Sequence, residues 1–589
     1  MKIFEATITY QVSEYLYNNL QNIISFETAN LKMHDTFGIV HFFNNNEELA
    51  TLKETISISN SIVSEPDRTE YGDFQTNEDL AIKCALFLAN KSANPQIIIE
   101  PTCGKGNFII ASLSTFSNIE FIFGIEIYKP YVWEAKFNII QFYLSNSKEN
   151  KPNISIIHYD VFDYDFKSLA KQYAEKEILI IGNPPWVTNS KLGSLNSSNL
   201  PKKSNFKNHS GLDAMTGKGN FDIAEFISLK MLELFQNMKG NLLLLVKNSV
   251  IKNIVSDQIK NKYSISDIEK HCIDSKKEFN VSVEASLLYC KLNSIAQNYC
   301  TEFNLYNNQN PTLKFGWLND KFVSNIDTYV YTKNIDGECP FVWRQGLKHD
   351  CSTIMELDKE NGHYVNGLNE EIILEEDLVY GLLKSSDLKN TVINQTRKYT
   401  IVTQKKVGQE TKYIKNKFPK TYQYLIDHQD SFNARKSSIY TNKPAFSIFG
   451  IGDYSFQPFK VAISGLYKTF HFTLILPQNE KPVMLDDTCY LIGFDKLEFA
   501  VYALILLNSD TTVQFLQSVT FADAKRTFTK DVLMRIDLLE LATNIDRKDL
   551  ETELQRLNKV YNLNMTLCLW GKFVEEMKPV SNGQIELFI

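Results

Sequence analysis

The apolar run ILII at residues 178–181, followed after one glycine by Asn183 and two prolines, constrains the fold more than any other stretch. Four aliphatic residues in a row predict a central strand that is buried on both faces. Pro184 and Pro185 cannot continue the hydrogen bonds of a strand, so we expect it to end at Asn183. The Asn183 side chain and the carbonyls of this stiff segment are hydrogen-bond acceptors, and we expect Trp186 to be an exposed, flat stacking surface beside them. Such a set suits a planar group that carries an NH2, and an ordinary strand-to-loop turn is the alternative interpretation.

Three further apolar runs precede this strand, at residues 96–100, 119–127 and 154–162, with helical stretches between them. Strands that alternate with helices at this spacing predict an α/β fold with a doubly wound, mostly parallel sheet. Ligands of such sheets bind beyond the carboxyl ends of the strands. A helix at 220–235 and strands at 241–246 and 285–292 would complete a core of six or seven strands.

The sequence pattern changes near residue 330, where short predicted strands, lysine-rich loops and scattered aromatic residues replace the alternation of strands and helices. We therefore expect three parts. Residues 1–70 would pack on the next domain, residues 71–330 would form the α/β domain, and residues 331–589 would form a second domain of mixed α+β structure.

Composition argues against a membrane or secreted protein. The strongest apolar run, residues 242–246, is far too short to span a bilayer, and the amino terminus MKIFEATITY lacks the pattern of a secretory leader. The nine cysteines include no CxxC pair, which argues against a zinc or disulfide framework. We expect a cytoplasmic protein without a membrane partner or a metal.

A glycine turn and two acidic residues predict a nucleoside site at the strand ends. Gly104 and Gly106 let the backbone approach a ligand, but the stretch is not a dinucleotide GxGxxG motif because Ile109 replaces the third glycine. Glu126, at the end of the next strand, can accept both hydroxyls of a ribose. Asp160 could accept from an adenine amino group, so the set suits an adenosine without a polyphosphate; a solvated loop carboxylate is the alternative for each acid.

The order of these motifs carries a family resemblance. FQT at 74–76, EPTCGKGNF at 100–108, GIEI at 124–127, YDVF at 159–162 and GNPPW at 182–186 resemble the S-adenosylmethionine-dependent N6-adenine DNA methyltransferases, gamma class. This resemblance implies a class I methyltransferase (Rossmann-like) fold for residues 71–330. It also implies a DNA target-recognition domain in residues 331–589.

The resemblance assigns roles to residues of this chain. The S-adenosylmethionine site, which would release S-adenosylhomocysteine, would comprise Phe74, Thr76, Glu100, Pro101, Thr102, Cys103, Gly104, Gly106, Phe108, Glu126, Ile127, Asp160, Val161 and Phe162. The catalytic motif would be Asn183, Pro184, Pro185 and Trp186, where Trp186 replaces the usual tyrosine or phenylalanine. Phe279, just before a late core strand, resembles an aromatic residue that stacks on the target base, and ordinary core packing is its alternative.

The chemistry of the catalytic motif follows from the atoms. The lone pair of a purine amino group is delocalised into the ring. If the Asn183 side chain and the Pro184 carbonyl accept hydrogen bonds from the two N–H groups, this lone pair becomes localised on the nitrogen. The target adenine must leave the duplex to reach these acceptors. An asparagine before the two prolines resembles the adenine-specific form, whereas cytosine-N4 enzymes more often carry a serine.

A basic segment in the carboxyl half suggests where DNA binds. Residues 384–438 hold ten lysines and two arginines against three aspartates and one glutamate, a net charge of +8 in a chain of net charge -7. Four tyrosines (399, 413, 422 and 424) are interleaved with them. We expect contacts to DNA phosphates from Lys405, Lys406, Lys412, Lys415 and Lys417. A solvated charged surface is the alternative.

Other functions use part of this pattern. A protein-glutamine or RNA adenine methyltransferase could use the same NPP motif, and a non-catalytic DNA-specificity subunit could share the basic carboxyl half. The long basic carboxyl half favours double-stranded DNA over protein or RNA as the substrate. The glycine turn, Glu126 and the catalytic motif together favour an enzyme over a non-catalytic subunit. We expect a monomer on DNA, in a restriction-modification or related defence system, paired with a separate restriction endonuclease or acting alone.

Overall fold

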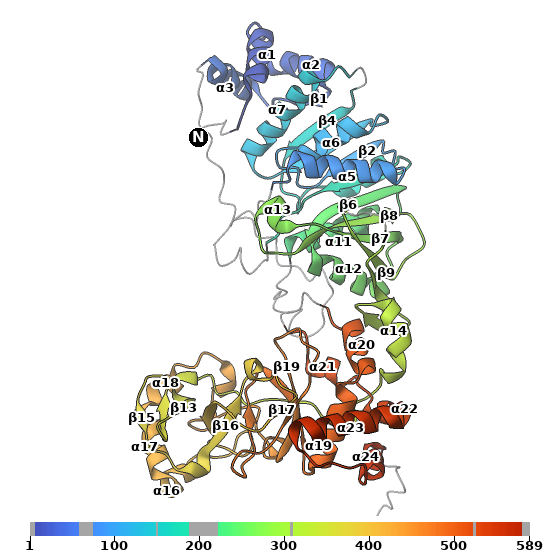
Figure 1. The fold of residues 1–589 in the computed structure, drawn as a ribbon. Coiled ribbons are helices and arrows are strands. Elements are labelled where there is room, and N and C mark those ends of the chain that lie inside the picture. Colours follow the sequence, from blue (N-terminus) through green and yellow to red (C-terminus); the bar gives the residue numbers. More distant parts are fainter. Residues whose placement is uncertain are drawn as a thin grey trace, which may run out of the picture. The chain divides into compact units, whose positions relative to one another are not determined.

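The computed structural model describes residues 6–57, 75–148, 151–187, 222–306, 310–521 and 526–579. The chain forms two compact units, Met1–Phe322 and Val323–Ile589 (Figure 1).

Unit 1 is built on one sheet with the strand order β1-β4-β3-β2-β5-β6-β8-β7-β9-β10-β11. Its strands are β1 (Ile39–Val40), β2 (Ile97–Glu100), β3 (Phe121–Glu126), β4 (Asn153–His158), β5 (Ile178–Gly182), β6 (Gly240–Lys247), β7 (Ile265–Cys272), β8 (Ala285–Leu292), β9 (Tyr299–Asn304), β10 (Leu313–Leu318) and β11 (Lys321–Val323). Its helices are α1 (Tyr10–Leu20), α2 (Phe26–Phe37), α3 (Asn46–Ser57), α5 (Glu78–Asn90), α6 (Asn107–Thr115), α7 (Lys129–Ser145), α8 (Phe166–Gln172), α11 (Ile223–Phe235), α12 (Asn248–Asn261) and α13 (Ser275–Phe279).

The predicted doubly wound, mostly parallel α/β sheet is confirmed. Pairing is parallel from β1 through β6, and β8 runs antiparallel to β6 and β7. The sheet is larger than predicted at both edges: β1 extends one edge, and β9 to β11 extend the other. β7 was not predicted, since its sequence ISDIEKHC mixes charged and apolar residues and its pairing with β8 is interrupted by a bulge after Ser266.

The register of the parallel strands brings their carboxyl ends to one edge. Ile97 of β2 pairs with Phe121 of β3 on one side and with Ile178 of β5 on the other. All residues of β2 and β5 are buried, as expected for strands covered on both faces. The segments that follow Glu100 and Gly182 therefore leave the sheet side by side.

The amino-terminal segment is joined to this sheet. β1 pairs with β4, and α1, α2 and α3 gather beside α7 at the same end of the unit (Figure 1). The buried ammonium group of Lys136 in α7 donates hydrogen bonds to the carbonyls of His41 (3.2 Å) and Phe42 (2.8 Å). Burial lowers the pKa of Lys136 to about 8. These contacts extend the sheet beyond the α/β core.

Unit 2 holds a five-stranded sheet, β12-β22-β19-β20-β17, and a six-stranded sheet, β15-β14-β13-β18-β16-β21. The strands are β12 (Arg344–Gln345), β13 (Glu356–Glu360), β14 (His363–Asn366), β15 (Glu371–Ile372), β16 (Val379–Leu383), β17 (Val392–Ile393), β18 (Lys398–Ile401), β19 (Phe459–Ser464), β20 (Thr473–Ile475), β21 (Met484–Leu485) and β22 (Cys489–Phe494). The helices are α14 (Ile326–Thr332), α15 (Ser352–Met355), α16 (Tyr413–Lys417), α17 (Pro419–Asp427), α18 (Gln429–Asn433), α19 (Leu497–Leu507), α20 (Asp510–Val519), α21 (Lys530–Leu533), α22 (Leu538–Asn544), α23 (Arg547–Tyr561) and α24 (Trp570–Met577).

The helices of unit 2 divide between its two sheets. The α16–α18 helices lie beside the six-stranded sheet, whereas α19 packs on β19 and β22 and is surrounded by α22, α23 and α24 (Figure 1). Within the described ranges no single helix could cross a membrane by length and apolarity, and only α19 and α20 taken together, across a 60° bend, have that length and composition.

Candidate active site

The turn after β2 has a backbone shape that favours glycine at two positions. Gly104 has φ +50° and Gly106, which precedes α6, has φ +82°. A Cβ atom added to Gly104 would lie 2.5 Å from Oε1 of Gln75, so a side chain does not fit there without displacing Gln75. The Gln75 oxygen accepts the Lys105 N–H at 3.2 Å. The turn is thus held tightly against the segment that precedes α5.

Glu126, at the end of β3, holds the same turn from the other side. One carboxylate oxygen accepts the Gly104 N–H at 2.9 Å, and the other accepts the Tyr128 N–H at 2.7 Å. Each carboxylate oxygen can accept more than one hydrogen bond, so these contacts orient Glu126 without exhausting it as an acceptor.

Glu100 is buried without a compensating partner on one oxygen. Its side chain is 2% exposed, and within the described part of the chain its Oε2 atom accepts no hydrogen bond. Burial, with the nearby Glu126 carboxylate, raises the pKa of Glu100 well above its usual range. The site therefore contains a buried acceptor to which a donor group could bind.

The neighbours of Glu100 mainly support the turn. Cys103 and Phe108 are buried, and Pro101 is buried as well. Thr102 donates its hydroxyl to the Asn183 carbonyl at 3.5 Å, which links the turn to the end of β5. Ile127 is partly exposed, and its carbonyl lies 3.0 Å from His158 Nε2.

The segment after β4 is fixed by a lysine that the sequence did not single out. Asp160 accepts the Phe162 N–H at 2.8 Å, which orients its carboxylate. Lys230 of α11 donates to the carbonyls of Val161 and Phe162, both at 2.9 Å. Lys230 stands alone in the otherwise apolar and acidic stretch IAEFISLKMLELF, and this could have signalled a buried role. Burial lowers its pKa, which nearby aspartates partly offset.

β5 ends at Gly182, one residue before the predicted end at Asn183, so Asn183 follows the strand directly. Its Nδ2 donates to the hydroxyl of Thr76 at 3.2 Å. Pro184 is buried and Pro185 half-buried. The predicted catalytic motif, the glycine turn and Glu126 thus lie at the carboxyl edge of one sheet. Phe74, the first residue of the FQT motif, lies outside the described residues.

The prediction that Trp186 is exposed is wrong. Its side chain is 5% exposed, its indole N–H donates to the Leu245 carbonyl at 3.2 Å, and its ring packs edge-on against Phe279 with centroids 5.1 Å apart. β5 ends at Gly182, which pairs with Leu244, so no strand residue of β5 pairs with the Leu245 carbonyl and the indole occupies that position. Phe279 is itself only 9% exposed.

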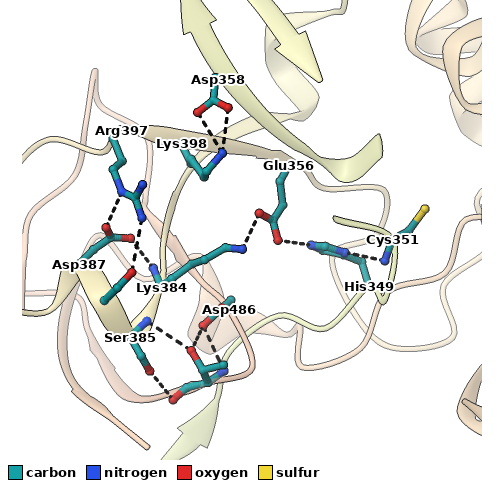
Figure 2. Close-up of polar contacts among 12 residues, drawn as sticks. His349, Cys351, Glu356, Asp358, Lys384, Ser385, Asp387, Arg397, Lys398 and Asp486 are labelled. Carbon is teal, nitrogen blue, oxygen red and sulfur yellow. Dashed lines mark hydrogen bonds and ion pairs between the residues drawn. The ribbon is translucent and has the colours of Figure 1, made fainter. Parts of the chain in front are cut away.

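Fewer cations of the basic segment, residues 384–438, are available to bind DNA than its composition suggests. Three of its cations pair with acids, as Figure 2 shows: Lys384 with Glu356 (2.6 Å), Arg397 with Asp387 (2.7 Å) and Lys398 with Asp358 (2.9 Å). Its four tyrosines pack in or against the core of the six-stranded sheet, so they do not form an exposed aromatic stripe.

The five lysines proposed for DNA remain available. Lys405, Lys406, Lys412, Lys415 and Lys417 are exposed, and none of them takes part in an ion pair among the described residues. Lys412 and Lys415 line a surface hollow of about 570 Å3, together with Lys443 and Tyr422. Three lysines against one acid, Glu410, give the lining of this hollow a net positive charge that can accommodate anionic groups.

Glu100→Gln should stabilise the ligand-free protein at neutral and alkaline pH. Because the folded pKa of Glu100 is raised, wild-type stability decreases as pH rises above the ordinary value of 4.5, whereas a neutral glutamine carries no such penalty. Melting curves should show a higher midpoint for the variant at pH 8 and convergence as pH falls towards 4.5.

Glu120→Gln is the matched control for this measurement. The pKa of Glu120 is lowered by a hydrogen bond from Lys176, so its replacement should leave the midpoint unchanged or lower it at pH 8. A Glu100→Gln variant that melts below wild type at pH 8, or whose difference from wild type does not vary with pH, would contradict the assignment.

Comparisons with known proteins place the chain in a family. No family model matches the chain. The chain is 41% identical to the Type II methyltransferase M.NspV from Nostoc sp. (strain ATCC 29411 / PCC 7524) over 479 residues, which are 81% of this chain and 98% of the relative. Among solved structures, the Type IIL restriction-modification enzyme MmeI in complex with DNA is similar in fold, with a TM-score of 0.51 and 13% identity, covering 90% of this chain and 84% of that one. The identity to M.NspV extends over most of both chains, and the chain therefore belongs to the family of Type II methyltransferases.

Proposed function

We propose that the protein is a sequence-specific DNA adenine-N6 methyltransferase that transfers a methyl group from S-adenosylmethionine to an adenine flipped out of the duplex. The observation that carries the proposal is the position of Asn183, which directly follows β5 beside the glycine turn and is oriented by Thr76. Family membership supports methyl transfer, and the asparagine-proline-proline sequence supports an NH2 group as the acceptor.

The residues around the turn suit the cofactor. The lack of side chains at Gly104 and Gly106 lets the turn pack against Gln75 and Ala135. Glu126 is oriented to accept ribose hydroxyls, and Glu100 offers a buried acceptor for a donor group. Asp160, held by Lys230 through its neighbours, would accept the adenine amino group of the cofactor. S-adenosylmethionine, when bound there, supplies an electrophilic methyl group.

The chain's own residues would then activate the acceptor nitrogen. The Asn183 side-chain oxygen and the Pro184 carbonyl would accept hydrogen bonds from the two N–H groups, which localises the nitrogen lone pair and orients it for in-line attack. The methylated nitrogen then loses one of these protons to water. Neither residue forms a covalent bond. Trp186 and Phe279 would hold the flipped base, and because both are nearly buried, one of these side chains must rotate to expose a ring face.

Unit 2 would bind double-stranded DNA through the exposed lysines near α16. We place the protein, acting as a monomer on DNA, in a restriction-modification or related defence system in the cytoplasm, with a separate endonuclease or alone. The DNA complex of MmeI, whose fold is similar, is consistent with double-stranded DNA as the substrate.

Asn183→Ala should abolish most methyl transfer and leave binding intact. Removal of one preorganised hydrogen-bonding group from a transition state lowers kcat by about 100-fold or more. Tritium transfer to duplex DNA measures the rate, and calorimetry measures cofactor and duplex affinity. Transfer at the wild-type rate would remove Asn183 from the reaction.

Glu126→Ala should weaken S-adenosylmethionine binding by about 1–3 kcal/mol, because a buried acceptor of hydrogen bonds is lost. Glu126 also holds the Gly104 and Tyr128 N–H groups, so Glu126→Gln, which keeps one side-chain oxygen, should lose less affinity. Calorimetry with both variants tests this order, and wild-type affinity in the alanine variant would exclude Glu126 from the site.

Replacing Lys412 and Lys415 with alanine should flatten the dependence of log affinity for DNA on log salt by about 0.9 per lost phosphate contact. The preferred DNA sequence should not change. The matched control is Arg397→Ala with Lys398→Ala, which removes two cations that already pair with acids. An equal change of slope in both double variants would show that only total charge matters.

A further inference from the structure

The tripeptide Gln75-Thr76-Asn77, which leads into α5, contacts three separate parts of the candidate site. Gln75 binds the glycine turn through the Lys105 N–H, and the Thr76 carbonyl accepts from Asn107 Nδ2 at 2.6 Å. These two hydrogen bonds hold the Gln75 side chain and the Thr76 carbonyl against the glycine turn and the start of α6.

The other two contacts lead to the acceptor side of the site. The Thr76 hydroxyl accepts from Asn183 Nδ2 at 3.2 Å. Asn77 caps α5 and donates to Glu278 at 2.8 Å, and Glu278 precedes Phe279 in α13. The tripeptide therefore joins the glycine turn to the residues proposed to meet the target base.

The bond between Thr76 and Asn183 determines which end of the amide is presented. An asparagine side chain has one oxygen acceptor and one NH2 donor, and only the oxygen can accept an N–H bond of an amino group. With Nδ2 bound to Thr76, Oδ1 is the end that faces elsewhere. Thr76 is 6% exposed, so water cannot readily replace its hydroxyl.

We infer that Thr76 is a positioning residue for Asn183: its buried hydroxyl holds the amide nitrogen and so presents Oδ1 to the amino group that is methylated. The inference rests on the proposed function and adds a role to the cofactor contact expected of Thr76. A side chain that only touched the cofactor would alter cofactor affinity, whereas a positioning hydroxyl alters kcat.

Thr76→Val and Thr76→Ser test this role, because valine keeps the shape and removes the hydroxyl while serine keeps the hydroxyl. Thr76→Val should lower kcat by about tenfold, the effect of one lost hydrogen bond, and should lower kcat by more than it weakens cofactor binding, with duplex Kd within about threefold of wild type. Thr76→Ser should restore most of kcat. A valine variant whose cofactor affinity falls as much as its kcat, or a serine variant as slow as valine, would overturn the inference.

A second measurement asks whether Thr76 acts through Asn183. In an Asn183→Ser background the amide is absent, so Thr76→Val should cause no further loss of rate. A loss equal to that in the wild-type background would show that Thr76 acts through another group. The proposed function is tested separately, by identifying the acceptor that the wild-type protein methylates. The ratio of kcat between Thr76→Val and Thr76→Ser can be measured with that acceptor, whether it is DNA, RNA or protein.

Discussion

The parallel pairing of β3, β2 and β5 is the constraint on which the candidate site depends. Because Ile97 pairs with both Phe121 and Ile178, the three strands end at one edge of the sheet. Glu126 can then bind the Gly104 N–H, and Thr102 can reach the Asn183 carbonyl. A shift of one residue in the pairing of β5 would turn Asn183 to the other face of the sheet and separate these groups.

Side chains from outside the strands hold the loops of this edge. Thr76 fixes Asn183, Gln75 fixes the glycine turn and Lys230 fixes the segment after Asp160. Glu100 differs, because its burial disfavours the charged form that predominates in water at neutral pH. A ligand that donates a hydrogen bond to Glu100 would remove this penalty. Part of the free energy that the buried carboxylate costs the ligand-free protein would then contribute to ligand binding.

The sequence allowed the strands and the order of motifs to be predicted, but not the polar contacts between them. The sequences of β2, β5 and β8 are mainly apolar, so these strands and their burial could be predicted. β7 contains several charged residues and could not be predicted as a strand. The contact between Thr76 and Asn183 joins residues 107 positions apart, and no local pattern encodes it. The exposure of Trp186 was predicted wrongly, because the Leu245 carbonyl is left for the Trp186 indole N–H only through the point at which β5 ends beside β6. Likewise, composition could not show which cations of the basic segment pair with acids on neighbouring strands.

The identity of the methylated atom tests the central claim most directly. Duplex DNA is incubated with the purified protein and labelled S-adenosylmethionine, digested to nucleosides and analysed by mass spectrometry, with protein and RNA acceptors treated in parallel. The arrangement of Asn183 and Pro184 predicts N6-methyladenine from duplex DNA. N4-methylcytosine, or methylated protein glutamine or RNA with unmodified DNA, would contradict it.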